Sequence, residues 1–425
     1  MDKIIATDRR IFAWAMYDWA NSAFATVVMA GFFPIFFKQF WSTGVDASSS
    51  TFHLGVANSL ASLVIVAVAP VLGAIADQGN ARKQFLLLFS SLGIFMTAAL
   101  FWLAAGQWQM AMAVFVSGTI GFMGANVFYD ALIVDVADEQ DYDQVSAFGF
   151  ALGYLGGGLM FAFCVLMTRR PEWFGLANME IAVRWSFLLA AGWWAVFSIP
   201  LFLYVKDRES RTPNISRQVL LLGFTQLAKT FKQIRHLKMV GLFLLAYWMY
   251  IDGVDTIVRM AVDYGLSLGF DQGNLIMALL LTQFVGFPAA IVFGRIAQKI
   301  GTKRGLFLGI AVYIAITVWA SRMQEVWEFY GLAVTIGLVQ GGIQALSRSF
   351  YARIIPADKA AEFFGFYNVL GKFAAVIGPV LVGTISLLTE NPRLSILSIL
   401  LLFVCGAGLL YFVDEQRAHL AAQSL

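Results

Sequence analysis

The chain has few cysteines, histidines and charged residues, and each shortage removes a class of function. The two cysteines, Cys164 and Cys405, lie in separate apolar runs, so neither a disulfide framework nor a thiolate metal site is expected. The three histidines, His53, His236 and His419, lie at predicted loops or ends, which argues against a histidine metal site. Walker A, HExxH and GxSxG motifs are also lacking. We therefore expect no enzyme, no ATP-driven pump, no metal and no cofactor.

Charged residues make up 13% of the 425 residues, whereas hydrophobic residues make up 60%. A soluble domain is about 25% charged, so this composition indicates a protein that crosses a membrane several times. The apolar run after Arg9 and Arg10 is long and contains Asp18 and Asn21. It is expected to be a permanent first span rather than a cleaved signal peptide.

Runs of about 20 apolar residues predict an all-α membrane protein with twelve transmembrane helices. The expected spans are residues 11–37, 52–76, 85–106, 108–133, 146–168, 183–205, 239–262, 273–297, 305–322, 329–353, 362–388 and 393–413. The connector 206–238 divides the chain into two six-helix halves, 1–205 and 239–425. Its apolar and basic residues alternate with helical spacing, which predicts an amphipathic helix on the membrane surface; we do not expect it to bind nucleic acid.

The distribution of Lys and Arg predicts the orientation. With an even number of spans, both termini and the connector share one side. That side carries 21 of the 29 Lys and Arg residues, the other side carries five, and Arg184, Arg259 and Lys372 lie within spans. Basic residues favour the inner side of a membrane. Both termini are therefore expected in the cytoplasm, in a plasma or bacterial inner membrane. The acidic loop 135–143 contributes little to this rule.

The two halves repeat short motifs. Residues 73–83, after the second span, share a glycine, an apolar pair and a terminal basic pair with residues 294–304, after the eighth, at an offset of 221. Residues 148–150 and 364–366 both read Phe-Gly-Phe, at an offset of 216. Two similar offsets at matching places predict a duplicated plan, with a binding site between the halves.

Residues 73–83 resemble the signature between spans 2 and 3 of the major facilitator superfamily. The resemblance implies a cytoplasmic latch of ion pairs and a helix dipole, formed by Gly73, Asp77, Arg82 and Lys83. Gln298 stands where the second copy needs an acid, so any latch there is expected to be asymmetric. Residues 14–26 are similar to the first span of the unknown major facilitator branch, which is related to the autophagy-linked vacuolar amino-acid effluxer of yeast. The superfamily default also implies a monomer.

Polar residues recur in every third span. In the seventh, Asp252, Asp255 and Arg259 stand at i, i+3 and i+7, which is one helix face. A charge at the bilayer centre costs about 2.5–3.5 kcal/mol on insertion scales, so such residues usually face a wet cavity. Spans 1, 4 and 10 carry Tyr17, Asp18, Asn21, Asn126, Tyr129, Asp130, Gln340, Gln344 and Arg348. The resemblance implies that these four spans line the central cavity.

Each cluster also has a structural interpretation. Asp255 and Arg259 are spaced to form a bracing ion pair, and Asp18 is near enough to the start of its span to lie at the membrane interface. Asn126 and Gln344 suit interhelical hydrogen bonds. Arg348 is near enough to a span end to pair with a lipid headgroup or a loop acid. Lys372 suits either a gate or a side chain that reaches the interface.

The expected function is secondary transport by alternating access. A cavity with charges of both signs suits a small zwitterion, and the carboxylates suit coupling to protons or another ion. The family resemblance favours amino-acid efflux. A flippase for lipid-like molecules and a membrane sensor that does not transport remain as alternatives.

Overall fold

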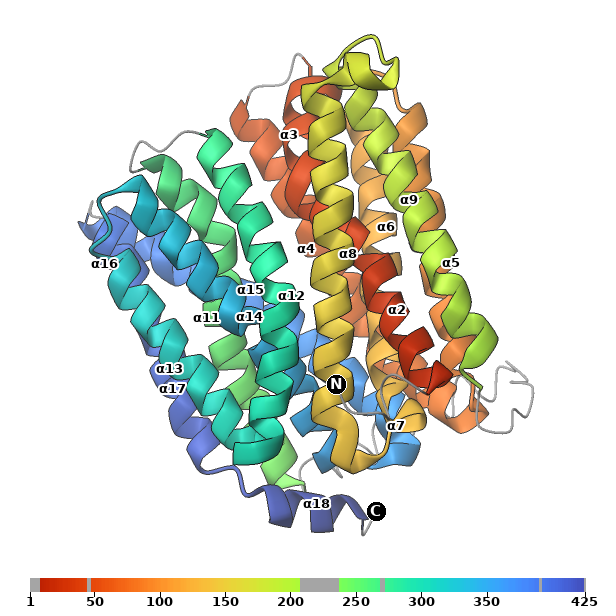
Figure 1. Cartoon of the computed structure of the whole chain (residues 1–425), viewed down its shortest axis with the longest axis vertical. Helices are drawn as coiled ribbons and strands as arrows, with labels where there is room; N and C mark the ends of the chain where they lie inside the picture. The colour runs from red at the N-terminus through yellow and green to blue at the C-terminus, as the bar shows by residue number, and fades with distance from the viewer. Residues whose placement is uncertain (1–7, 44–46, 207–236, 268–271, 390–391, 424–425) are drawn as a thin grey trace.

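The computed structural model describes residues 8–43, 47–206, 237–267, 272–389 and 392–423. All regular structure in these ranges is helical, and the helices stand side by side in one bundle (Figure 1). The expected amphipathic helix in 206–238 falls almost wholly outside the described ranges.

The N-terminal half begins with one long element, Arg9–Trp41. It consists of α2 (Arg9–Ala23), a π-helical segment (Phe24–Phe32), α3 (Phe33–Phe36) and a second π-helical segment (Phe37–Trp41). Pro34, at the start of α3, cannot donate a backbone hydrogen bond, and the wider turns lie on either side of it. The half continues with α4 (Ala47–Gly79), α5 (Arg82–Ala99), α6 (Trp108–Ala131), α7 (Ile133–Val136), α8 (Tyr142–Arg169) and α9 (Met179–Tyr204).

The C-terminal half follows the same plan. Its helices are α11 (Lys238–Ser267), α12 (Gln272–Ile300), α13 (Thr302–Ala320), α14 (Val326–Ile354), α15 (Ala360–Thr389), α16 (Pro392–Leu397), α17 (Leu400–Tyr411) and the short C-terminal α18 (Glu415–Gln423).

The expected spans agree with these helices to within a few residues at each end. Eleven helices in the described part of the chain are long and apolar enough to cross a membrane. The remaining expected span, 362–388, corresponds to α15, which has 30 residues. The last expected span, 393–413, differs in detail because a turn at Ser398 and Ile399 divides it into α16 and α17.

The halves meet along two sides of the bundle. On one side α8 packs against α12 and α14, and on the other α4 packs against α15. Figure 1 shows α8 and α12 next to each other at the centre, with α7 and α18 at one end of the bundle and α3 near the other. We call the end with α7 and α18 the terminal face. The contacts that position the site lie between the centre of the bundle and this face.

Candidate functional site

Arg348 of α14 is the centre of the candidate site. Its side chain is only 2% exposed, and it reaches across from the C-terminal half into the N-terminal half. Nη1 lies 3.0 Å from Asp130 Oδ1 and 3.5 Å from Asp18 Oδ2. Nε donates to Ser146 Oγ at 2.8 Å, and Nη2 donates to the Ser146 carbonyl at 3.0 Å. Arg348 therefore pairs with two acids inside the bundle, rather than with a loop acid.

The two carboxylates have further partners. The Tyr129 hydroxyl donates to Asp18 Oδ2 at 2.8 Å, and Asn368 Nδ2 of α15 donates to Asp130 Oδ2 at 3.0 Å. Asp18 and Asp130 keep 14% and 13% of their side-chain surface exposed. Two carboxylates and one guanidinium carry a net charge of −1 when all are ionised, so the cluster has room for one more positive charge.

Three aromatic rings surround the guanidinium. Its Cζ lies 4.4 Å from the ring centroid of Phe150, 4.8 Å from that of Trp14 and 5.4 Å from that of Tyr129. These distances are in the range of cation–π attraction. Gly149 leaves space for the cluster, because a Cβ there would lie 2.7 Å from Asp18 Oδ2.

Other polar residues of the first and fourth spans join helices within the N-terminal half. Asn21 Nδ2 donates to Asn126 Oδ1 at 2.7 Å, which connects α2 to α6. The Tyr17 hydroxyl lies 2.7 Å from Ser90 Oγ on α5. These contacts match the interpretation of such residues as interhelical hydrogen-bond partners.

The polar residues of the seventh span have separate surroundings. Asp252 is fully buried and accepts hydrogen bonds from the Gly378 backbone N–H, at 3.0–3.1 Å, and from Thr256 Oγ1, at 3.2 Å. Asp255 is half-buried and lies within electrostatic range of the Tyr154 hydroxyl. The side chains of Arg259 and Lys372 lie outside the described residues, so the Asp255–Arg259 pair and the gating role of Lys372 stay predictions.

Asp252 is expected to stabilise the fold. Asp252→Ala leaves the Gly378 N–H and the Thr256 hydroxyl without their acceptor, and each such buried loss costs about 1–3 kcal/mol. Asp252→Asn keeps one acceptor oxygen and should cost less. Thermal unfolding in detergent should rank wild type above Asn and Asn above Ala. Equal midpoints for wild type and the alanine variant would show that the contact contributes nothing.

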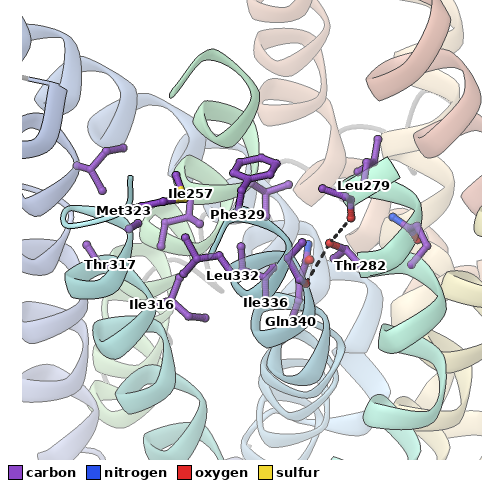
Figure 2. Close-up of a pocket in the computed structure, with 16 residues that line it drawn as sticks. Ile257, Leu279, Thr282, Ile316, Thr317, Met323, Phe329, Leu332, Ile336 and Gln340 are labelled. Carbon is purple, nitrogen blue, oxygen red and sulfur yellow. Dashed lines mark hydrogen bonds between the residues drawn. The ribbon is translucent and has the colours of Figure 1, made fainter. Parts of the chain in front are cut away.

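The tenth span contributes two glutamines, Gln340 and Gln344, which lie two turns and one turn before Arg348 in α14. Gln344 Oε1 accepts from the Tyr154 hydroxyl at 3.2 Å, which joins α14 to α8. Gln340 lines a cavity of about 110 Å³ within the C-terminal half. Figure 2 shows Thr282 and Leu279 on one side and Ile316, Thr317 and Met323 on the other, with Gln340 between them. The apolar lining comes mainly from α12, α13 and α14 and includes Leu279, Ile316, Phe329, Leu332 and Ile336.

Asp77 connects the halves near the terminal face. Its carboxylate accepts from Arg82 Nε at 2.7 Å and from the backbone N–H groups of Ala361 and Glu362 at 3.1 and 2.8 Å. These donors lie in the first turn of α15, where an anion is favoured by the helix dipole. A Cβ on Gly73, one turn earlier, would lie 2.4 Å from the Ala361 carbonyl oxygen, so α4 and α15 touch through their backbones.

Arg82 completes this connection. Its Nη1 donates to Asp135 Oδ2 at 2.7 Å, and its Nη2 donates to the Ala357 carbonyl at 2.8 Å. Lys83 lies apart from the contact between the halves. Its Nζ donates to the Val205 carbonyl, at 2.7 Å, after the end of α9. In the other half, Lys303 Nζ donates to the Val413 carbonyl, which follows the end of α17, also at 2.7 Å.

The second copy of the motif takes its acid from the other half. Gln298 hydrogen-bonds Gln144, while Asp143 of α8 accepts from Arg353 Nη2 at 2.9 Å and from Thr302 Oγ1 at 2.8 Å. The second copy thus has Gln298 in the place of the acid, and a carboxylate from α8 contacts Thr302 of this copy instead. Asp143 is the acid that the second copy lacks in its own sequence.

Sequence reasoning did not place Trp14, Ser146 and Phe150 in the site. One signal points toward part of it. Asp130 and Arg348 are 218 residues apart, an offset between the two found for the internal repeats. The ion pair therefore joins the fourth and tenth spans, which the repeat relates, at a separation close to the repeat offsets.

The comparisons with known proteins agree with this fold. The family described as "Vacuole effluxer Atg22 like" matches residues 43–140 and 133–423. An uncharacterized MFS-type transporter of Bacillus subtilis, YxiO, is 39% identical over 411 residues, which cover 96% of this chain and 95% of that protein. Autophagy-related protein 22 of Eremothecium gossypii is 24% identical over 489 residues, covering 99% and 94%.

Solved structures of the major facilitator superfamily have the same fold. The proton:xylose symporter XylE matches with a TM-score of 0.73 at 13% identity, covering 96% of this chain and 95% of that one. FucP in its outward conformation matches with a TM-score of 0.71 at 12% identity, covering 95% and 98%. The protein is therefore an integral, multi-pass membrane protein that belongs to the Atg22-like branch of the major facilitator superfamily of transporters.

Proposed function

We propose that this protein exports a small zwitterionic solute, with an amino acid as the first candidate, by alternating access coupled to protons. The observation that carries the proposal is the buried pairing of Arg348 with Asp130 and Asp18. This cluster joins the two halves and has a net negative charge when ionised. A group that holds the halves together and can also take up a proton can couple proton binding to their separation.

The mechanism starts from the contacts near the terminal face, which we assign to the cytoplasm from the Lys and Arg distribution. Two contacts close this side: Asp77 of α4 accepts from the first turn of α15, and Asp143 forms an ion pair with Arg353. We infer that the structure is the outward-facing state. For the cytoplasmic side to open, Arg348 must leave Asp18 and Asp130. Protonation of one carboxylate weakens the ion pair and so lowers the cost of that step.

The region around Gln340 and Gln344, on the side of Arg348 that faces the start of α14, has groups that can bind the solute. The carboxylate of Asp255 attracts an ammonium group, and the amides of Gln340 and Gln344 offer donors and acceptors to a carboxylate. The cavity next to Gln340 has a mostly apolar lining, which fits an uncharged side chain. A few placed polar groups beside an apolar pocket are the usual composition of a small-molecule site.

Transport by purified protein in liposomes tests the proposal. A pH gradient is imposed in either direction, and the uptake of labelled amino acids, peptides and sugars is measured with and without a protonophore. We expect at least one amino acid to move faster when the gradient is present. The proposal fails if none of these solutes shows flux that depends on both the protein and the gradient.

Asp255→Asn should remove solute accumulation in this assay without loss of folded protein. The amide keeps the size of the side chain but cannot hold an ammonium group by charge. Yield and monodispersity in size-exclusion chromatography monitor folding. Wild-type accumulation by Asp255→Asn would assign Asp255 a structural role instead.

A further inference from the structure

The groups that hold Arg348 come almost entirely from the other half of the protein. Trp14 and Asp18 belong to α2, Tyr129 and Asp130 to α6, and Ser146 and Phe150 to α8. We call these six residues the cage. Besides Arg348, two groups of the C-terminal half hydrogen-bond the cage in the described part of the chain: Asn368 donates to Asp130, and the Ala345 carbonyl accepts from the Ser146 hydroxyl. When the halves separate at the terminal face, the cage should stay together because all six residues belong to the N-terminal half.

The chemistry of the cage is that of a site for an organic cation. Three ring faces lie 4.4–5.4 Å from the guanidinium carbon, and aromatic faces in this arrangement bind ammonium and guanidinium groups. The carboxylates supply opposite charge, and Ser146 supplies two acceptor oxygens. Arg348 thus occupies a preformed site in the way that a ligand would.

An empty cage is unfavourable. Breaking a buried ion pair by removing one partner leaves a charge uncompensated, which is strongly destabilising. Once Arg348 withdraws, the carboxylates must be neutralised by protons or by another cation. Asp18 and Asp130 keep 14% and 13% of their side-chain surface accessible even in this closed state, so neither carboxylate is fully enclosed.

We propose that the cage is a second solute site, which binds the primary ammonium or guanidinium group of the transported solute after Arg348 leaves it. Arg348 and the solute then compete for one cage, and only one of them occupies it at a time. In the inward-facing state the solute cation compensates the two carboxylates, and its departure from the cage lets Arg348 return. This inference rests on the proposed separation of the halves.

Arg348→Ala tests the cage directly because it empties the site without any transport step. Purified Arg348→Ala is titrated with methylguanidinium, and separately with methylammonium, by isothermal titration calorimetry. We expect saturable binding of at least one of them, at least tenfold tighter than to wild type. The double variant Arg348→Ala/Asp130→Asn should lose at least tenfold of that affinity. Equal binding by all three proteins, or no binding, would overturn the proposal.

Arg353→Ala is the matched control. It also removes an arginine that pairs with an acid between the halves, Asp143, but it leaves Arg348 in the cage. We expect no gain in binding of methylguanidinium or methylammonium. A gain as large as that of Arg348→Ala would mean that any vacated arginine site binds these ions, and the cage would lose its special role.

Instability of Arg348→Ala does not block the test. If the emptied cage destabilises the protein, methylguanidinium or methylammonium should raise the melting temperature of Arg348→Ala and leave that of Arg353→Ala unchanged. Absence of stabilisation in an unstable Arg348→Ala would count against the cage. Because neither measurement involves flux, binding without transport would refute the proposed function alone, whereas transport without binding would refute the cage alone.

Discussion

Asp130→Asn should abolish solute accumulation driven by a pH gradient. The amide still offers Arg348 an acceptor oxygen but has no charge and takes up no proton. Removing one partner of a buried ion pair costs about 3–5 kcal/mol. Since Arg348 keeps Asp18, we expect about 3 kcal/mol, or more than about a 100-fold shift toward the inward-facing state. Solute exchange across liposomes without a gradient should persist, because exchange requires no net proton movement.

Asp414→Asn is the control for this substitution. Asp414 also pairs with an arginine, Arg417, but the pair is exposed, with 44% and 78% of the two side chains accessible. Exposed pairs contribute about 0–1 kcal/mol, so accumulation by Asp414→Asn should match wild type. If Asp130→Asn accumulates solute as wild type does, the coupling carboxylate must be sought elsewhere. Loss of both accumulation and exchange would instead mean that Asp130 is needed for solute binding or for the fold, and size-exclusion chromatography of the variant separates these two outcomes.

The helices were the predictable part of this protein. Long apolar runs of about 20 residues have few alternatives to a transmembrane helix, because backbone polar groups in lipid must be satisfied within the segment. The spans expected from the sequence therefore match the helices, apart from small shifts at the ends. The turn at Ser398 and Ile399 was not predictable, since the run 393–413 contains no glycine or proline before residue 406 to signal an interruption.

The partners of the charges were less predictable. The spacing of Asp252 and Asp255 predicts one helix face, and neighbours at i and i+3 do lie near each other on a helix surface. Yet Asp252 is fully buried and binds a backbone N–H of α15 at Gly378, whereas Asp255 is only half-buried. A backbone donor has no side-chain signature, so sequence patterns cannot reveal it.

The same limit applies to Arg348. Its sequence neighbours left three partners open, namely a lipid headgroup, a loop acid or the central cluster. Which of these partners Arg348 pairs with depends on the position of α14 relative to α2 and α6, and tertiary packing sets that position. The repeat offset contains the missing information in part, because Asp130 and Arg348 are 218 residues apart, which is close to the offsets of 216 and 221. Residues related by such a repeat approach one another near the axis between the halves.

Gly73→Leu should separate α4 from α15 at the terminal face and reduce transport at least about tenfold, which corresponds to about 1.4 kcal/mol. A Cβ at residue 73 would lie 2.4 Å from the Ala361 carbonyl oxygen and 2.8 Å from the Glu362 Cα. Both are backbone atoms that cannot rotate away, so α4 must move from α15 and Asp77 must lose its two backbone donors. The distance between spin labels at the exposed residues Gln78 and Asp358 should therefore increase.

Gly192→Leu is the control that distinguishes the forced separation of α4 and α15 from the general cost of replacing a helical glycine. Gly192 lies within α9, and a Cβ there meets no atom within 4 Å. Transport and the label distance should both stay at wild-type values in Gly192→Leu. If Gly73→Leu also keeps the wild-type distance, then α4 and α15 tolerate the added side chain. The Asp77 contact would in that case not hold the terminal face closed, and the closure would rest on Asp143 and Arg348 instead.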